Sequence, residues 1–307
     1  MAKNTAALVT ALRDKPGACM MNCKMALNEN DADIEASVDW LRTQGLAAAA
    51  KKSGRVASEG LVGITTDGGK GAIVEINAET DFVARNEDFQ TFVENVSSIV
   101  LRGNGKLEDL KANAYVGGTE TVEATLTNMI AKIGENMELR RSASLEVSNG
   151  VVCSYMHNAL KPGLGKIGVL VALESDVDAE QLEALGKQLA MHVAAANPQA
   201  ISRDDVDADD IEREKTILAE QARESGKPDD IIAKMVEGRL RKYYEEMCLL
   251  EQTYVIDGDT KVGKVIETAG KEIGAPIILK SFVRCALGEG VEKKEEDFRD
   301  NLAYFKS

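Results

Sequence analysis

The first 55 residues repeat apolar positions at intervals of three and four, which is the spacing of amphipathic helices. The pattern predicts three short helices, from Thr5 to Arg13, from Ala18 to Asn28 and from Asp33 to Gln44. Asp33 precedes the third apolar series, so its carboxylate is a candidate N-cap. Residues 46–55 predict either a linker or a continuation of that helix. Because a module this small buries little surface by itself, we expect it to dock onto the rest of the chain or onto a partner.

From Val56 onward the pattern changes to an alternation with a period of two, which is typical of strands. Two such runs flank Asp67-Gly68-Gly69, a turn sequence, and predict a β-hairpin. Helical spacing returns over 88–101 and 122–133, and a second group of strands begins at Ser144. The expected strands are 61–66, 72–78, 145–147, 151–156 and 166–174. In the second group, a turn at 148–150 separates the first two strands, and a helix at 179–196 follows the third. Since hairpin, strand and helix occur twice, we expect two related α+β halves.

Between Asp204 and Glu246 the chain is charged and helical in pattern, with a break at 225–228. Apolar residues recur at helical spacing on both sides of the break, which predicts an αα-hairpin with an apolar stripe on each arm. Three partners for the stripes stay open: a second copy of the chain, another protein, or the body of the chain itself. After the hairpin we expect a strand from Gln252, then a helix at 261–273, a strand at 277–286 and a charged terminal helix.

Together these patterns predict an α+β fold with an N-terminal three-helix module, two related α+β core subdomains and an inserted helical hairpin. The expected boundaries are 1–55 for the module, 56–141 for the first core subdomain, 142–203 with 247–307 for the second subdomain and the terminal helix, and 204–246 for the hairpin.

Composition narrows the class of partner. The formal net charge of −14 argues against a surface that coats nucleic-acid phosphates, so we expect a protein partner and no direct contact with nucleic acid. No apolar run approaches the roughly 20 residues that span a bilayer, and the N-terminus shows no export signal. The cysteines are odd in number and scattered, which favours reduced thiols in the cytoplasm. They are Cys19, Cys23, Cys153, Cys248 and Cys285.

The strongest candidate for chemistry is the pair Asp81-Phe82, which follows the predicted strand and precedes a predicted helix. Side chains at such a strand end can project from the body of the protein. An acidic and an aromatic side chain would then act together as an electrostatic probe and a wedge. The alternative is that Phe82 fills the local core and Asp81 caps the following turn.

Two other patterns resemble active-site motifs without completing them. Residues 258–264 fit the first seven positions of a phosphate-binding loop, but Val265 stands where a hydroxyl would hold Mg²⁺. Cys19 and Cys23 could share a helix face, but other metal ligands are scarce because His157 and His192 are the only histidines. We therefore expect no cofactor, no bound metal ion and no catalytic residue.

Four groups of residues follow one another along the chain: Leu12-Arg13, Gly17-Ala18, Met20-Met21, Cys23-Lys24 and Ala26-Leu27; then 75–86; then 131–136 with Arg140-Arg141; and finally 225–228 with 234–239. In this order they resemble the signatures of the elongation factor Ts family, whose members are nucleotide-exchange factors for elongation factor Tu. Pro16, Cys19 and a longer loop at 158–164 depart from the family pattern and leave those loop geometries open.

The resemblance implies a guanine-nucleotide exchange factor that binds elongation factor Tu with GDP and promotes GDP release. Phe82 would insert between two helices of elongation factor Tu, and Asp81 would disturb the surroundings of the Mg²⁺ ion there. The implied wedge consists of Thr80, Asp81, Phe82 and Val83. The alternative function is a scaffold or chaperone-like protein that holds the GTPase without driving exchange.

The resemblance also implies further contacts with elongation factor Tu. The three-helix module resembles a ubiquitin-associated domain and would touch the G domain, while two positions in the core would touch the partner elsewhere. The residues of the module are Arg13, Met20, Met21 and Lys24, and those of the core are Ile133 and His157. The ordinary alternatives are core-filling methionines, solvated charges, a core isoleucine and a structural histidine. A homodimer through the helical hairpin is a further possibility.

Overall fold

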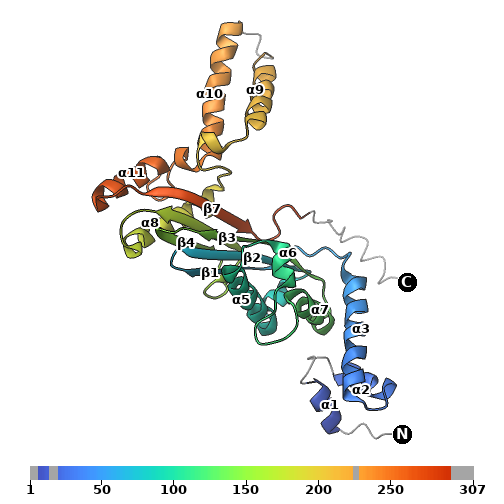
Figure 1. The fold of residues 1–307 in the computed structure, drawn as a ribbon. Helices are drawn as coiled ribbons and strands as arrows, with labels where there is room; N and C mark the ends of the chain where they lie inside the picture. The colour runs from blue at the N-terminus through green and yellow to red at the C-terminus, as the bar shows by residue number, and fades with distance from the viewer. Residues whose placement is uncertain (1–5, 14–19, 224–227, 292–307) are drawn as a thin grey trace. The chain divides into compact units, whose positions relative to one another are not determined.

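The computed structural model describes residues 6–13, 20–223 and 228–291 and confirms a mixed helix-and-sheet protein (Figure 1). Its α-helices are α1 (Ala6–Arg13), α2 (Met20–Glu29), α3 (Ile34–Lys52), α4 (Asp81–Ala84), α5 (Glu87–Arg102), α6 (Leu107–Ala112), α7 (Val122–Ile133), α8 (Ala179–Ala196), α9 (Ala208–Arg223), α10 (Asp229–Met247) and α11 (Val262–Ile273). Short 3-10 helices are η1 (Arg203–Asp205) and η2 (Leu249–Glu251). The strands are β1 (Glu59–Asp67), β2 (Lys70–Ala78), β3 (Met137–Glu146), β4 (Gly150–His157), β5 (Leu164–Gly165), β6 (Ile167–Glu174) and β7 (Ile278–Ala286).

The chain divides into two compact units. The described part of the first unit comprises residues 6–13, 20–63, 74–143 and 286–291, and that of the second comprises 64–73, 144–223 and 228–285. The finer division into four parts stays a prediction. The predicted terminal helix, the starts of the first two helices and the loop 225–227 lie outside the described residues.

The first unit begins with the predicted three-helix module. Its small core consists of Leu12, Cys23, Ala26, Leu27 and Leu41. The N-cap prediction is confirmed, because Asp33 Oδ1 accepts a hydrogen bond from Ala36 N at 2.9 Å. Helix α3 continues to Lys52, so the linker alternative for this stretch is wrong as far as that residue. Its alanine run favours helix, and Gly45 permits close packing on α7 because a Cβ there would lie 3.4 Å from that of Ala131.

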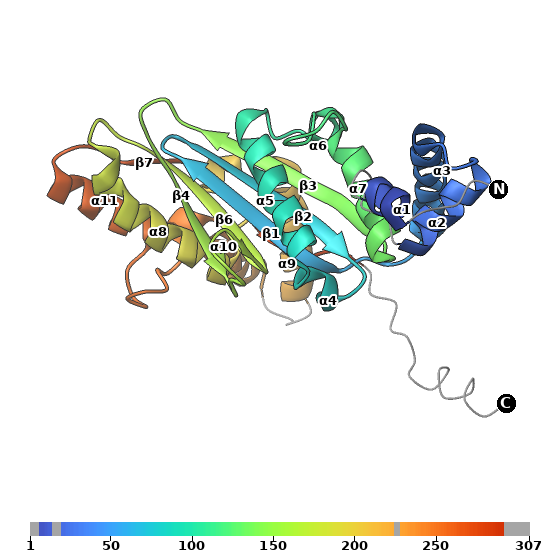
Figure 2. The same ribbon diagram turned by 90° about the horizontal axis from the view of Figure 1, so that it is seen from below.

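The four-stranded sheet has the order β3-β2-β1-β5, and the predicted hairpin of β1 and β2 is confirmed. Gly68 lies at its turn with φ of +54°, a conformation that glycine adopts without strain. Helix α5 runs along this sheet, as Figure 2 shows from below, and buries Phe89, Phe92 and Val96. The short elements α4, α6 and β5 were not predicted, because each is too short for a helical or strand periodicity to be recognised in the sequence.

The predicted hairpin between 145–147 and 151–156 is wrong. Strand β3 begins at Met137 and neighbours β2, whereas β4 pairs antiparallel with β6, with Cys153 opposite Val171. The turn signal at 148–150 is real, but it carries the chain from one sheet to the next. A local turn sequence does not determine which two strands pair, since strand pairing depends on contacts distant in sequence.

The second unit has the three-stranded sheet β4-β6-β7, covered by α8. Its core includes Val169, Val171, Leu182, Leu189 and Val193. The predicted strand from Gln252 is wrong: residues 252–260 form a loop. Asp257 Oδ1 accepts hydrogen bonds from the N–H groups of Asp259 and Thr260, each at 3.0 Å, and this side-chain-to-backbone bonding stabilises a turn over a strand.

The predicted αα-hairpin is present as α9 and α10, which pack against each other. Leu218 and Ile232 are buried, so part of each apolar stripe faces the other arm. Ile217 and Ile231 are each 41% exposed and leave apolar surface on both arms. The pairing of that surface with a second copy or a partner stays a prediction.

The two halves repeat the same architecture, although the second half is built on the pairing of β4 with β6 and not on the predicted hairpin. Strand order is β3-β2-β1 in one half and β7-β6-β4 in the other. In each half the helix before the last strand ends at a glycine in the left-handed region, Gly134 with φ of 90° and Gly274 with φ of 86°. The preceding loops also match, since Tyr115 N donates to Glu120 O and Tyr254 N donates to Thr260 O, both at 2.8 Å.

Candidate functional site: an exposed acidic and aromatic tip

The tip is the turn that follows β2. Thr80 has extended backbone angles and precedes α4, a helix of four residues. Val83 and Ala84 are buried and anchor this short helix on the body of the first unit. Phe82 is instead 73% exposed, so the alternative that it fills the local core is wrong.

Asp81 lies in the first turn of α4 and does not cap it, so the capping alternative is also wrong. Its Oδ2 atom forms an ion pair with Arg85 Nη2 at 3.1 Å, one helical turn later. The Arg85 side chain is largely exposed and that of Asp81 about half exposed, and such surface pairs contribute at most about 1 kcal/mol. The carboxylate of Asp81 is therefore available to a stronger electrostatic partner.

Two carboxylates attach the tip to the turn between α7 and β3. Glu135 Oε2 accepts a hydrogen bond from Thr80 N at 3.0 Å, and Glu135 Oε1 accepts one from the Thr80 hydroxyl at 2.8 Å. Glu79 Oε1 accepts a hydrogen bond from Asn136 N, and Asn136 Nδ2 donates to Arg55 O at 2.8 Å. Neither Glu79 nor Glu135 was predicted as a site residue, although both stand inside the segments that resemble the family signatures.

The module residues expected to contact a partner lie on α1 and α2. Met20 and Met21 are 62% and 68% exposed, so the alternative that they fill the core is wrong for both. Lys24 is exposed and lies one turn after Met20, on the same side of α2. Arg13 ends α1, and its side chain lies outside the described part of the structure.

The two remaining predicted contact residues belong to different units. Ile133 is half-buried at the end of α7, two residues before Glu135, and so lies near the tip. His157 is exposed at the end of β4 in the second unit, and its Nδ1 atom lies 3.2 Å from the Tyr155 hydroxyl. The other histidine, His192, is buried and serves the core: its Nε2 atom lies 2.9 Å from Gln252 Oε1, and its Nδ1 atom accepts from Val255 N at 3.2 Å.

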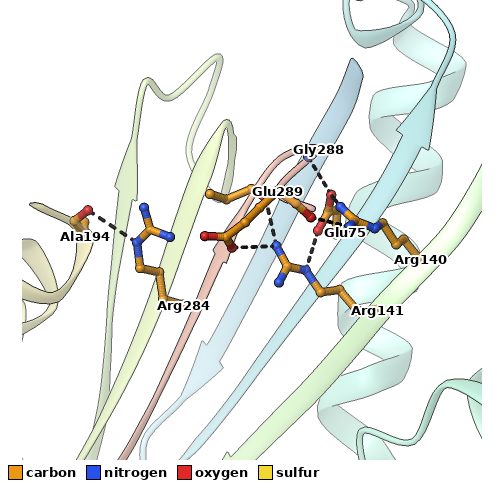
Figure 3. Close-up of polar contacts among 8 residues, drawn as sticks. Glu75, Arg140, Arg141, Ala194, Arg284, Gly288 and Glu289 are labelled. Carbon is orange, nitrogen blue, oxygen red and sulfur yellow. Dashed lines mark hydrogen bonds and ion pairs between the residues drawn. The ribbon is translucent and has the colours of Figure 1, made fainter. Parts of the chain in front are cut away.

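A buried charged cluster in the first unit was also missed by the sequence analysis (Figure 3). The carboxylate of Glu75 on β2 is fully buried and accepts hydrogen bonds from Arg140 Nη1 at 3.0 Å, from Arg141 Nε and from Gly288 N at 2.8 Å. Arg141 Nη2 also donates to Ala286 O at 2.8 Å. This cluster attaches residues 286–289 to the sheet. The pair Arg140-Arg141 was visible in sequence, but its carboxylate partner lies about 65 positions earlier.

The incomplete phosphate-loop motif lies in the second unit, over the end of the loop 252–260 and the start of α11. Its two lysines pair with carboxylates, Lys261 with Glu245 and Lys264 with Glu267, each at 3.0 Å. Lys271 and Lys264 together lower the pKa of Glu267 to about 2. Cys23, half of the other incomplete motif, is a buried core residue, and Cys19 lies outside the described residues.

Metal-binding clusters and membrane-spanning helices are both absent from the part of the chain that the structure describes. Within that part, no group of three or more histidine, cysteine, aspartate or glutamate side chains is arranged to hold a metal ion. No described helix is long and apolar enough to cross a membrane. The feature that stands out is the exposed side chain of Phe82 on a turn attached through Thr80 and Glu135.

Comparison with known proteins identifies the family. A model of the family described as Elongation factor TS matches residues 79–289. Elongation factor Ts of Rhodospirillum rubrum is 63% identical over 304 residues, covering 99% of this chain and 98% of the relative. Elongation factor Ts of Sphingopyxis alaskensis is 59% identical and that of Zymomonas mobilis 57% identical, each over 304 residues with the same coverage. The protein is thus a translation elongation factor, and the chain belongs to the elongation factor Ts family.

Proposed function

We propose that this protein is a guanine-nucleotide exchange factor that binds elongation factor Tu with GDP and promotes GDP release in the cytoplasm. It acts by conformational catalysis on its partner and makes or breaks no covalent bond. The observation that carries the proposal is the tip: an exposed phenylalanine beside a carboxylate, on a turn attached at Thr80, in a chain of this family.

The proposal assigns a separate task to each residue of the tip. Phe82 enters between two helices of elongation factor Tu and stabilises a rearranged nucleotide site. Asp81 exchanges its weak pairing with Arg85 for the neighbourhood of the Mg²⁺ ion, where a carboxylate competes with phosphate oxygens for a hard cation. Thr80, directly before Asp81, and Val83, directly after Phe82, hold these two side chains in place.

The energy needed exceeds what the tip can supply alone. A 10⁴-fold acceleration asks for about 5.5 kcal/mol of differential stabilisation. Burying the Phe82 side chain contributes about 1.5–3 kcal/mol. The rest must come from an extended interface, for which the exposed surface of α2 with Met20, Met21 and Lys24 is the nearest candidate.

The other proposed contacts follow the same reasoning. Arg13 belongs with the α2 residues against the G domain, Ile133 contacts the partner beside the tip, and His157 contacts it from the second unit. The net charge of −14 argues that the acidic surface works on a protein and not on nucleic acid. The helical hairpin, with its exposed isoleucines, is the candidate surface for a homodimer.

An exchange factor differs from a scaffold in what it binds best. An exchange factor must bind nucleotide-free elongation factor Tu more tightly than the form with GDP and Mg²⁺, because equal affinities shift no equilibrium. We therefore expect the dissociation constants for the two forms, measured by calorimetry, to differ by about 10³-fold or more. Equal constants would leave the scaffold as the function. The double variant Asp81→Ala/Phe82→Ala should reduce the difference while still binding.

A further inference from the structure

We propose that Glu135 is a positioning residue for nucleotide exchange, which holds Thr80 so that Asp81 and Phe82 leave the body of the first unit in a fixed direction. The inference rests on the proposed function of the tip. Glu135 itself is half-buried behind the tip and needs no contact with the partner. Its task is to restrict the turn that carries the two acting side chains.

The contact geometry suits this task because it restrains the backbone as well as a side chain. One oxygen of Glu135 accepts from Thr80 N and the other from the Thr80 hydroxyl, at 3.0 and 2.8 Å. Thr80 is the residue directly before Asp81, and its backbone angles set the direction of α4. A charged acceptor forms stronger hydrogen bonds than a neutral one, so the carboxylate holds this residue firmly.

Glu135 is supported on both sides in sequence. Gly134 ends α7 in the left-handed conformation, and its N–H donates to Ile130 O at 2.9 Å. Asn136 is only 6% exposed and is attached to Glu79 and to the carbonyl of Arg55. The carboxylate therefore projects from a rigid turn. A rigid support is what a positioning group requires, since small displacements of acting groups are costly.

The second half of the protein offers an internal comparison. There Ser175 comes directly after β6, and Thr80 in the first half comes after β2 with one residue between. The Ser175 hydroxyl donates to Pro276 O at 2.8 Å, and Pro276 lies shortly after Gly274. This bond joins the corresponding two turns of the second half. Its acceptor is a backbone carbonyl, which accepts from the Ser175 hydroxyl and not from the Ser175 backbone N–H. The residues that follow are Asp176 and Val177, and Val177 packs against the core of its unit. The carboxylate that also accepts a backbone N–H occurs in the half that carries the exposed phenylalanine.

This difference separates a positioning role from a purely structural one. The fold joins the two turns in the second half with one hydrogen bond from a hydroxyl. In the first half, the additional hydrogen bond from Thr80 N to Glu135 restrains the backbone directly before Asp81. We therefore expect removal of Glu135 to affect the rate of exchange more than the stability of the protein.

The test uses the full chain and purified elongation factor Tu. The rate of release of a fluorescent GDP analogue is measured against the concentration of wild type, Glu135→Ala, Glu135→Gln and the control Ser175→Ala. Glu135→Ala should lower the maximal rate constant about 10-fold to 100-fold and change the half-saturating concentration less than about threefold. Glu135→Gln should retain most of the rate, because its amide can accept from Thr80 N and donate to the Thr80 hydroxyl. Ser175→Ala should match the wild type.

Two further measurements keep the outcome clear. In an Asp81→Ala/Phe82→Ala background, Glu135→Ala should lower the remaining rate by less than about twofold, since both groups that it positions are gone. Deuterium uptake over residues 79–85 should rise in Glu135→Ala while the thermal midpoint stays close to that of the wild type. Wild-type kinetics for Glu135→Ala, or an equal loss in the Asp81→Ala/Phe82→Ala background, would overturn the inference alone. If the wild type itself does not accelerate release, the proposed exchange function fails, and the role of Glu135 in it fails too.

Discussion

The guanidinium of Arg85, at the C-cap of α4, lies 3.1 Å from the carboxylate of Asp81 in the first turn of that helix. The tip thus carries its own counter-charge in the free protein. For Asp81 to act on a metal ion in a partner, this pairing must be released. Because Arg85 is largely exposed and Asp81 about half exposed, the release costs at most about 1 kcal/mol.

Replacing Arg85 should therefore have a small and favourable effect. We expect Arg85→Ala to raise the maximal rate constant of GDP release by up to about fivefold, the equivalent of 1 kcal/mol, whereas Asp81→Ala should lower it. The gain should shrink at high salt, because screening weakens the exposed pair in the wild type. A loss of activity in Arg85→Ala at both low and high salt would show that Arg85 contacts the partner itself.

Removing the buried carboxylate of Glu75 should destabilise the protein. Glu75→Ala leaves Arg140 and Arg141 without their buried partner, and breaking such a pair costs about 3–5 kcal/mol, with the lower end expected here because both guanidiniums are partly exposed. The free energy of unfolding from a urea titration measures this. The matched control is Glu146→Ala, which breaks an exposed pair with Lys70 at 2.9 Å and should cost less than about 1 kcal/mol. Similar values for the two variants would contradict the burial argument.

His192 should make stability depend on pH. Burial lowers the pKa of its imidazole from the ordinary value of 6.5, so the native protein holds the ring neutral. The unfolded chain then binds the extra proton first as pH falls. The contribution of His192 is therefore complete above about pH 6.5 and is lost as pH decreases toward the lowered pKa.

Urea titrations between about pH 5 and pH 8 test this, with stability expected to decline below about pH 6.5. His192→Gln should flatten the decline, even if the variant is less stable at every pH. His157→Gln is the matched control, since that ring is exposed, and it should keep the wild-type dependence. A flattened profile in the control and not in His192→Gln would contradict the assignment.

Local patterns predicted the elements well where the apolar repeat was long. Helices 122–133 and 179–196 were predicted with the bounds that the structure shows, and the strands of the first hairpin were predicted within two residues. Partners distant in sequence were not predictable in this way. Strand β3 neighbours β2 and not β4, and Thr80 is held by Glu135, 55 positions later. No local repeat encodes such a pairing.

The candidate site was predictable in position but not in geometry. The strand end at Asp81-Phe82 is visible in sequence, yet the same residues are compatible with a buried phenylalanine. Exposure of Phe82 follows because Val83 and Ala84 occupy the buried places of α4, a helix too short for its periodicity to be recognised. Likewise, two adjacent methionines indicate one exposed side chain at least, and the structure exposes both.

The rate of GDP release from elongation factor Tu tests the central claim most directly. A fluorescent GDP analogue is chased with excess unlabelled nucleotide over a range of concentrations of wild type, Asp81→Ala, Phe82→Ala and Val116→Ala, an exposed apolar control. We predict a large acceleration by the wild type and by Val116→Ala. Phe82→Ala should lower the maximal rate constant about 10-fold to 150-fold, the equivalent of losing 1.5–3 kcal/mol of burial. Release at the spontaneous rate with the wild type present, or undiminished release with both tip variants, would contradict the account.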